Sequence, residues 1–167
     1  MTKQYIHYGS NEFDKRLFRQ PLNYPYFNKP IGGLWASPTE PDYYGWKEWC
    51  LDNHFNIDRL NKSFIFTLKD DAKILSIRNR REVYDLPSKF LIEYPYSNMS
   101  YIGQCQSFTE FLNKCKRYSI SVFLDFERII KEGYDAIEYS VYELYMELYG
   151  WDVDSLLVLN PNVVIQV

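Results

Sequence analysis

The chain has 167 residues, of which 46% are hydrophobic and 25% are charged, and its formal net charge is −3 at pH 7. This length and composition are typical of a globular protein with its own core, so we predict one domain over residues 1–167. The slightly acidic balance argues against a strongly basic nucleic-acid binder.

The sequence contains neither a membrane-directed segment nor a metal-binding pattern of cysteines and histidines. No apolar run approaches the ~18 residues of a membrane-spanning helix, and residues 1–10 contain no apolar signal-peptide region, so we expect a cytoplasmic protein without a membrane partner. The three cysteines include no CxxC pair and the chain has only two histidines. We therefore expect neither a disulfide framework nor a metal site.

The first half of the chain is predicted to combine short strands, a long loop and one helix. Alternating apolar residues between turn residues predict strands over 4–9, 33–37, 63–68 and 72–77. Three prolines within Ser10–Ile31 predict an irregular loop there. Thr39 and Asp42 have the spacing of a capping box, which predicts a helix from Glu40 to about Asn53.

The second half is predicted to begin with helices and to end with strands. Periodicity predicts helices over 80–86, 107–118 and 120–133, and strands over 134–140, 155–160 and 163–167. Ser107 and Glu110 form another capping box, and Gly133 is placed to end the last helix. Because strands and helices are mixed without regular βαβ alternation, we predict an α+β fold.

Three of the four tryptophans lie in the segment 28–50, beside a double glycine. Gly33 is expected to let the backbone bend sharply and to leave open space beside the next strand. Trp35 on that strand and Trp46 on the following helix are then placed to flank a slot for a flat ring, above all a positively charged pyridinium. The alternative is that both indoles fill the core where the helix crosses the sheet.

His7 and Glu138 are polar residues that gain meaning beside such a slot. His7 ends an apolar strand just before Gly9, where a histidine is either packed and hydrogen-bonded or a ligand-binding residue. Glu138 shares one strand face with Ala136 and Ser140 by the alternation of a strand. It either points to solvent or, near aromatic rings, stabilises a developing cation.

In chain order, the segments IHYGS, GGLWASPTEPDYYGW and AIEYS resemble the active-site segments of ADP-ribosyltransferases of the diphtheria-toxin type. That family has a histidine before a glycine on its first strand, two ring residues, and a glutamate on a later strand. Gly33, Trp35 and Trp46 reproduce the family's spacing of glycine and ring residues, with tryptophan in place of the usual tyrosines. Ser37 occupies the family's Ser/Thr position at the strand end.

The other segments match the family's active-site segments less closely. His7 and Gly9 resemble the family's His-Gly segment with Tyr8 inserted, and Glu138 is similar to the catalytic glutamate of its Val-Glu-Tyr segment. The end of the chain is also similar to other transferase-like domains, in which the acid lies just before the final hydrophobic strand. Ser155 has that place here, so the adjacent Asp154 is the reserve acid.

The resemblance implies a split pair of small mixed β-sheets with flanking helices, and NAD+ as co-substrate in the cleft between the sheets. It implies that His7, with Tyr8 and Gly9 beside it, binds the adenosine ribose. It also implies that Trp35 and Trp46 sandwich nicotinamide and bend NAD+ so that its glycosidic bond is exposed.

Glu138, or Asp154 in reserve, would then stabilise a ribosyl cation as nicotinamide departs, as carboxylates do in glycoside hydrolysis. The implied activity is mono-ADP-ribosyl transfer from NAD+ to a protein or nucleic-acid acceptor, as in a toxin or a modifier in phage–host conflict. An inhibitory partner would suit such a protein. Ser10–Ile31 and Ser88–Gln106 are expected to face the acceptor.

Two other functions stay open from the sequence. The chain is alternatively a non-catalytic, aromatic-rich interaction module that does not bind NAD+. An enzyme of the RNA 2′-phosphate-transfer type also consumes NAD+, but that chemistry needs several basic residues around the phosphate, and the sequence places no such set. The chain has no P-loop, GxSxG or HExxH motif.

Overall fold

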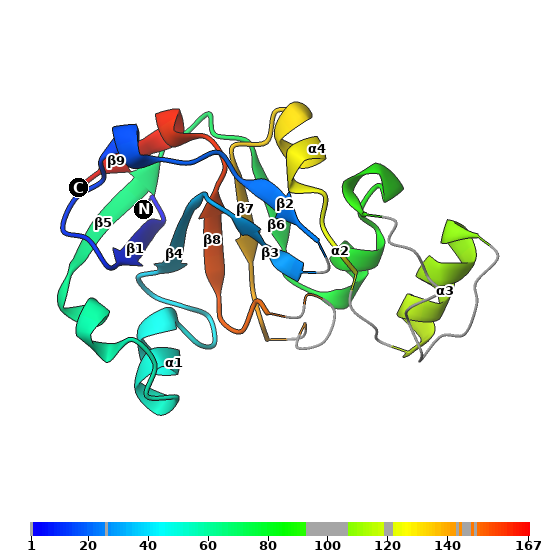
Figure 1. Cartoon of the computed structure of the whole chain (residues 1–167), viewed down its shortest axis with the longest axis horizontal. Helices are drawn as coiled ribbons and strands as arrows, with labels where there is room; N and C mark the ends of the chain where they lie inside the picture. Colours follow the sequence, from blue (N-terminus) through cyan, green and yellow to red (C-terminus); the bar gives the residue numbers. More distant parts are fainter. Residues whose placement is uncertain are drawn as a thin grey trace.

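The computed structural model describes residues 2–25, 27–92, 107–118, 122–142, 144, 148 and 150–167 of the chain. Within these ranges the fold is α+β, with one large mixed sheet, a small two-stranded sheet and a few short helices (Figure 1). Most of Ser88–Gln106, which the sequence suggests as an acceptor-facing segment, lies outside the described residues.

The large sheet contains every strand that the sequence predicted. Its seven strands lie in the order β6-β7-β8-β4-β1-β5-β9, and β6 and β7 are parallel. Their bounds are β1 (Gln4–Tyr8), β4 (Leu34–Pro38), β5 (Ser63–Leu68), β6 (Ile74–Ile77), β7 (Ala136–Tyr139), β8 (Ser155–Val158) and β9 (Val164–Gln166). The predictions succeed because each strand carries its own alternating or continuous apolar run between turn residues.

The sheet divides into two halves at β4. Residues 34–36 of β4 pair with β8, whereas Ser37 and Pro38 pair with Ile6 and Tyr5 of β1. A pair of small sheets was expected. The ladder is instead continuous, because β4 passes its pairing from one half to the other.

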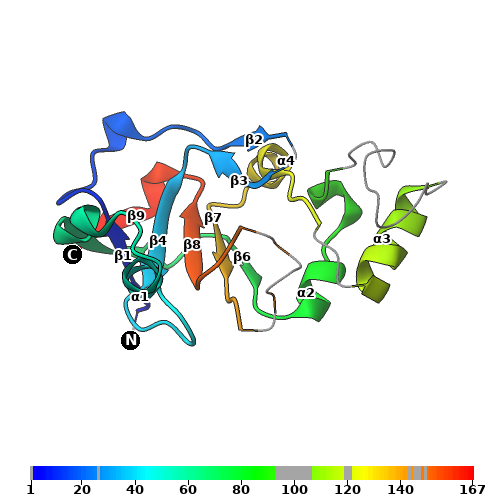
Figure 2. The same cartoon turned by 60° about the horizontal axis from the view of Figure 1, so that its bottom comes forward.

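The predicted loop Ser10–Ile31 is wrong for its second part, which forms a hairpin of β2 (Leu22–Tyr24) and β3 (Phe27–Ile31). Long-range hydrogen bonds from two amide side chains hold this hairpin. Asn23 accepts from the backbone N–H of Phe126, and Asn28 bonds the backbone of segment 122–124. The hairpin therefore lies beside α4 (Phe126–Lys131), as Figure 2 shows.

The helix after β4 is shorter than predicted. α1 runs from Trp46 to Asp52, and Thr39 is not its cap, because the Thr39 amide and hydroxyl both donate to the carbonyl of Gln4. The amide of Tyr43 donates to Asp154, so the segment before α1 takes tertiary partners instead of helical ones. These partners are distant in sequence, which is why local spacing misplaced the helix start.

The other helices follow the sequence more closely. They are α2 (Arg80–Tyr84), α3 (Phe108–Tyr118) and α4, with the 3-10 turns η1 (Lys15–Leu17), η2 (Ile57–Asn61), η3 (Ser88–Phe90) and η5 (Pro161–Val163). Ser107 caps α3 as predicted, since its hydroxyl accepts from the Glu110 amide. α4 starts later than predicted, at the cap Asp125, and Gly133 follows its end with φ +81°. No helix of the described ranges has the length and apolar character needed to cross a membrane.

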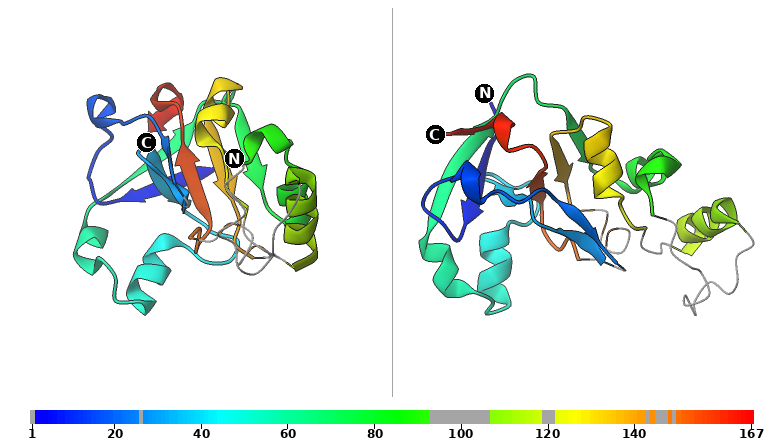
Figure 3. Two further views of the ribbon diagram at one scale, coloured as in Figure 1. Left: turned by 45° about the vertical axis from the view of Figure 1, so that its right-hand side comes forward. Right: turned by 45° about the horizontal axis from the view of Figure 1, so that its top comes forward.

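Two apolar clusters pack the two faces of the sheet. One, on the face that includes Ile137, Tyr139 and Leu157, contains Trp151 and packs against Trp35. The other contains Tyr5, Phe66, Leu156 and their neighbours. α1 and η2 lie at one end of the molecule and α3 at the opposite end, and β1 and β9 both flank β5 near the chain ends (Figures 1 and 3).

Candidate functional site

A cavity of about 290 Å³ opens where β1, β4 and the start of α1 meet, and we call it the main cavity because five of the predicted binding residues line it. His7 and Tyr8 of β1, Trp35 and Ser37 of β4, and Trp46 of α1 all line it. The structure thus brings together five of the residues that the sequence suggested for cofactor binding. The pairing of β1 with β4 places the two strands side by side at this wall.

Trp35 and Trp46 are each held by a neighbouring indole, and one of these neighbours, Trp151, also lines the cavity. Trp35 lies edge-on against Trp151, with ring centroids 4.8 Å apart and planes at 64°. Trp46 stacks on Trp49, at 5.1 Å and 9°, and both rings also contact Phe55. These contacts restrict the rotamers of the cavity walls, which favours a preformed site.

Ser37 ties the two walls together. Its hydroxyl accepts a hydrogen bond of 3.0 Å from the backbone amide of Trp46, the first residue of α1. The residue that precedes the helix is Gly45, which has no side chain to cap that amide. The Ser37 hydroxyl on β4 therefore caps the first turn of α1 in place of a side chain at Gly45. This bond fixes the position of Trp46 relative to Trp35.

His7 bridges β1 and β4 beyond the last pair of their ladder. Its Nδ1 donates to the carbonyl oxygen of Trp35 at 2.7 Å, so the proton of the neutral ring is on Nδ1 and Nε2 is left as an acceptor. Burial lowers the pKa of His7 below its ordinary value of 6.5, a shift that the bond to the Trp35 carbonyl partly offsets. The ring is therefore neutral at pH 7.

A second, shallower cavity of about 590 Å³ shares His7 with the first. Gly9, Ser10 and Arg19 are among its lining residues. Gly9 has φ +116°, and a Cβ there would lie 3.8 Å from His7 Nε2. The free acceptor of His7 therefore faces the side of Gly9, and the imidazole stands between the two cavities.

Gly33 bends the backbone before β4 as expected and lines the second cavity, but its side toward β8 is closely packed. A Cβ built on Gly33 would lie 2.4 Å from Leu157 Cδ1 and 3.2 Å from the Val158 carbonyl oxygen, so no side chain fits there. Its φ of +75° also favours glycine. Gly33 thus allows β4 to turn out of the hairpin and pack closely on β8.

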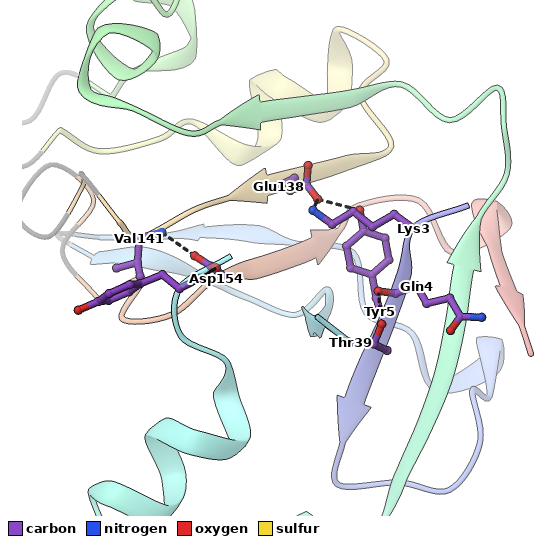
Figure 4. A network of polar contacts seen from close by, with 8 residues as sticks. Lys3, Gln4, Tyr5, Thr39, Glu138, Val141 and Asp154 are labelled. Atoms are coloured by element: carbon purple, nitrogen blue, oxygen red, sulfur yellow. Dashed lines mark hydrogen bonds and ion pairs between the residues drawn. The ribbon is translucent and has the colours of Figure 1, made fainter. Parts of the chain in front are cut away.

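Glu138 does not line the cavity. On β7 it pairs with Leu156, whereas Trp35 pairs with Leu157, so Glu138 and Trp35 belong to opposite faces of the sheet. Its Oε1 accepts from the Tyr5 hydroxyl and from Lys3 Nζ, each at 2.8 Å (Figure 4). Burial and the adjoining carboxylate raise the pKa of Tyr5 far above its ordinary value, so the phenol stays a donor.

Asp154, the reserve acid, is also engaged elsewhere. It is 2% exposed, and its two oxygens accept from the amides of Val141 and Tyr43, at 2.8 and 2.9 Å. Figure 4 shows Asp154 beside Val141, apart from Glu138. Two charge-assisted bonds to backbone amides are typical of a buried structural carboxylate, which here joins the start of β8 to the segments before α1 and after β7.

Sequence reasoning missed three charged residues of the main cavity, which are Lys29 of β3, Asp152 before β8 and Arg59 of η2. Lys29 Nζ and an Asp152 oxygen are 3.7 Å apart. No local pattern marks any of the three, because each comes from a different element. Only the packing of the hairpin, η2 and the 150–155 segment around one space makes them neighbours.

Comparisons of this chain with protein-family models, with curated proteins and with solved structures found no match.

Proposed function

We propose that this chain is a mono-ADP-ribosyltransferase that binds NAD+ across the two cavities and transfers its ADP-ribosyl group to a macromolecular acceptor. One observation carries the proposal. His7, Trp35, Ser37 and Trp46, chosen for their resemblance to an ADP-ribosyltransferase active site, lie around one cavity although they come from three separate elements.

The main cavity suits the nicotinamide end of the dinucleotide. Trp35 and Trp46 offer two ring walls to a positively charged pyridinium, and each contact of that kind is worth about 0.5–2 kcal/mol. Both walls are held by other rings, so little ordering is needed on binding. Lys29 and Arg59 bring positive charge to the same space, which is complementary to the diphosphate.

The second cavity suits the adenosine end. His7 separates the two cavities, and its Nε2 is an acceptor for a ribose hydroxyl. The proposal depends on the residues that line the cavities and not on a split sheet, because the seven strands of the large sheet form one continuous ladder. The acceptor is a protein or a nucleic acid, and a role as a toxin or a modifier in phage–host conflict belongs to the same proposal.

One observation favours the second candidate, an interaction module that does not bind NAD+. The outer face of the β2–β3 hairpin is apolar and exposed; Tyr24 stacks on Phe27, and Leu22 pairs with Ile31. All four side chains are about half exposed. An exposed apolar face of this kind is typical of a contact surface for another macromolecule.

Tryptophan fluorescence during titration with NAD+ separates the two candidates. We expect saturable quenching in the wild-type protein, and much weaker quenching in Trp35→Phe and Trp46→Phe. Asp85→Asn is the control, because Asp85 lines neither cavity and pairs with Arg81 instead. It should leave the NAD+ concentration for half-maximal quenching unchanged. Absence of any saturable change at millimolar NAD+ would favour the interaction module.

A further inference from the structure

Resting on the proposed function, we propose that Asp152 is the catalytic carboxylate of this site, the group that stabilises the ribosyl cation when nicotinamide leaves. A transfer of this kind needs a negative charge beside the reacting carbon. Among the described residues that line the main cavity, Asp152 is the one carboxylate.

Both acids suggested by the sequence are committed to other contacts. Glu138 is on the opposite face of the sheet, with Tyr5 and Lys3 on its oxygen. Asp154 is buried and accepts from two backbone amides. Moving either carboxylate into the cavity would take the acceptor from the buried Tyr5 hydroxyl, or from the amides of Val141 and Tyr43.

Asp152 stands on a fixed stretch of backbone. Its neighbour Trp151 is buried, packs on Trp35, and donates its indole N–H to the Asn28 carbonyl at 2.7 Å. Two residues further on, the amide of Asp154 donates to the carbonyl of Tyr44. Anchors on both sides hold the backbone of Asp152 at the cavity wall, so the carboxylate needs no loop closure to reach a ligand.

The side chain itself is free to act. Asp152 is 39% exposed, and its one ion pair in the described part of the chain is the long 3.7 Å contact with Lys29. A partly exposed pair of this length is worth little, so a ligand competes for the carboxylate easily. Asp152 also lines the same cavity as Trp35 and Trp46. When these two indoles hold the nicotinamide ring, the carboxylate is therefore placed beside the ribose attached to that ring.

The step needs only NAD+ and a nucleophilic acceptor. The bond between the anomeric carbon and the pyridinium nitrogen breaks, both electrons go to nicotinamide, and an oxocarbenium ion forms beside the Asp152 carboxylate. An acceptor hydroxyl or amine, or water, then attacks the anomeric carbon, and its proton passes to the carboxylate or to solvent. The products are nicotinamide, the ADP-ribosyl adduct and one proton.

The test measures NAD+ binding and nicotinamide release on the same protein. We expect Asp152→Asn to release nicotinamide from NAD+ at least ~100-fold more slowly than wild type, while NAD+ still quenches its fluorescence at a similar concentration. Asp152→Glu should recover part of the rate. Asp85→Asn is the matched control, because Asp85 also forms an exposed ion pair, with Arg81, on α2 and away from the cavity. It should release nicotinamide at the wild-type rate.

Each outcome decides between the inference and the proposed function. Failure of the wild-type protein to bind NAD+ would overturn the proposed function. Binding with no nicotinamide release by wild type would overturn the proposed transferase activity together with the role of Asp152, whereas release that Asp152→Asn retains would overturn the role of Asp152 alone. The inference also fails if Glu138→Gln loses the activity instead.

Discussion

The imidazole of His7 donates a 2.7 Å hydrogen bond to the carbonyl oxygen of Trp35, 28 positions away in sequence. This bond joins β1 to β4 just beyond the last backbone pair of their ladder. The His7 side chain thereby provides a hydrogen-bond donor for the Trp35 carbonyl, and it lies between the two cavities. Its protonation state affects both stability and the proposed binding of a ribose hydroxyl.

We predict that His7 contributes to a loss of stability at acid pH. Burial lowers the pKa of His7 in the folded protein below its ordinary value of 6.5, so the unfolded chain binds the proton more readily. The contribution of His7 to stability is therefore present above pH 6.5 and is lost as the pH falls through the lower, folded value. Urea unfolding at several pH values between 8 and 5 should show a shallower pH dependence for His7→Gln than for wild type.

The exposed His54 is the control for this experiment, since it does not line either cavity. His54→Asn, which tolerates the positive φ at that position, should keep the pH dependence of the wild-type protein. An unchanged slope in His7→Gln would show that the burial of His7 does not disfavour its protonation.

A second prediction concerns the hydroxyl that fixes Trp46. Ser37→Ala removes the acceptor for the Trp46 amide and should destabilise the protein by about 1 kcal/mol, as the loss of a helix cap does. Because the start of α1 would loosen, the NAD+ concentration for half-maximal quenching should rise several-fold. Ser107→Ala removes a similar cap from α3, away from the cavity. It should cost similar stability and leave the quenching unchanged.

Gly33 and Gly133 allow backbone strain to be separated from close packing. Both have positive φ, of +75° and +81°, but a Cβ on Gly133 would meet nothing within 4 Å. Gly133→Ala should therefore cost about 1 kcal/mol from the backbone alone. Gly33→Ala also drives a methyl group against Leu157 and should cost roughly 2–4 kcal/mol. Chemical denaturation of both variants checks the difference, and equal losses would contradict the close approach of β4 to β8.

A fourth prediction concerns the buried amide of Asn28. Its side chain bonds the Val122 carbonyl and the Leu124 amide, so Asn28→Ala leaves two buried backbone groups unpaired. We expect a loss of roughly 2–4 kcal/mol in the free energy of unfolding. Asn113→Ala, at an exposed position of α3, should change stability by less than about 0.5 kcal/mol. A small effect at Asn28 would mean that the hairpin is not held by this amide.

The strands of the large sheet were predictable because each carries its own signal. In β5 the buried residues Phe64, Phe66 and Leu68 alternate with more exposed ones, and this period is visible without any knowledge of the neighbouring strands. The cap of α3 by Ser107 is equally local, since donor and acceptor are three residues apart. In the site, the spacing of Trp35 and Trp46 selected two residues that do line one cavity.

Tertiary structure alone decided the start of α1, the hairpin, and the acid that faces the cavity. Thr39 could not be excluded as a helix cap until its partner on Gln4 was known. Glu138 stands next to aromatic residues in sequence, yet Tyr5, 133 positions away, accounts for its environment. Short-range patterns report which side of an element is apolar, because side chains three or four residues apart in a helix, or two apart in a strand, share a face. Which polar group meets which depends on contacts between distant elements, and only the folded chain sets those.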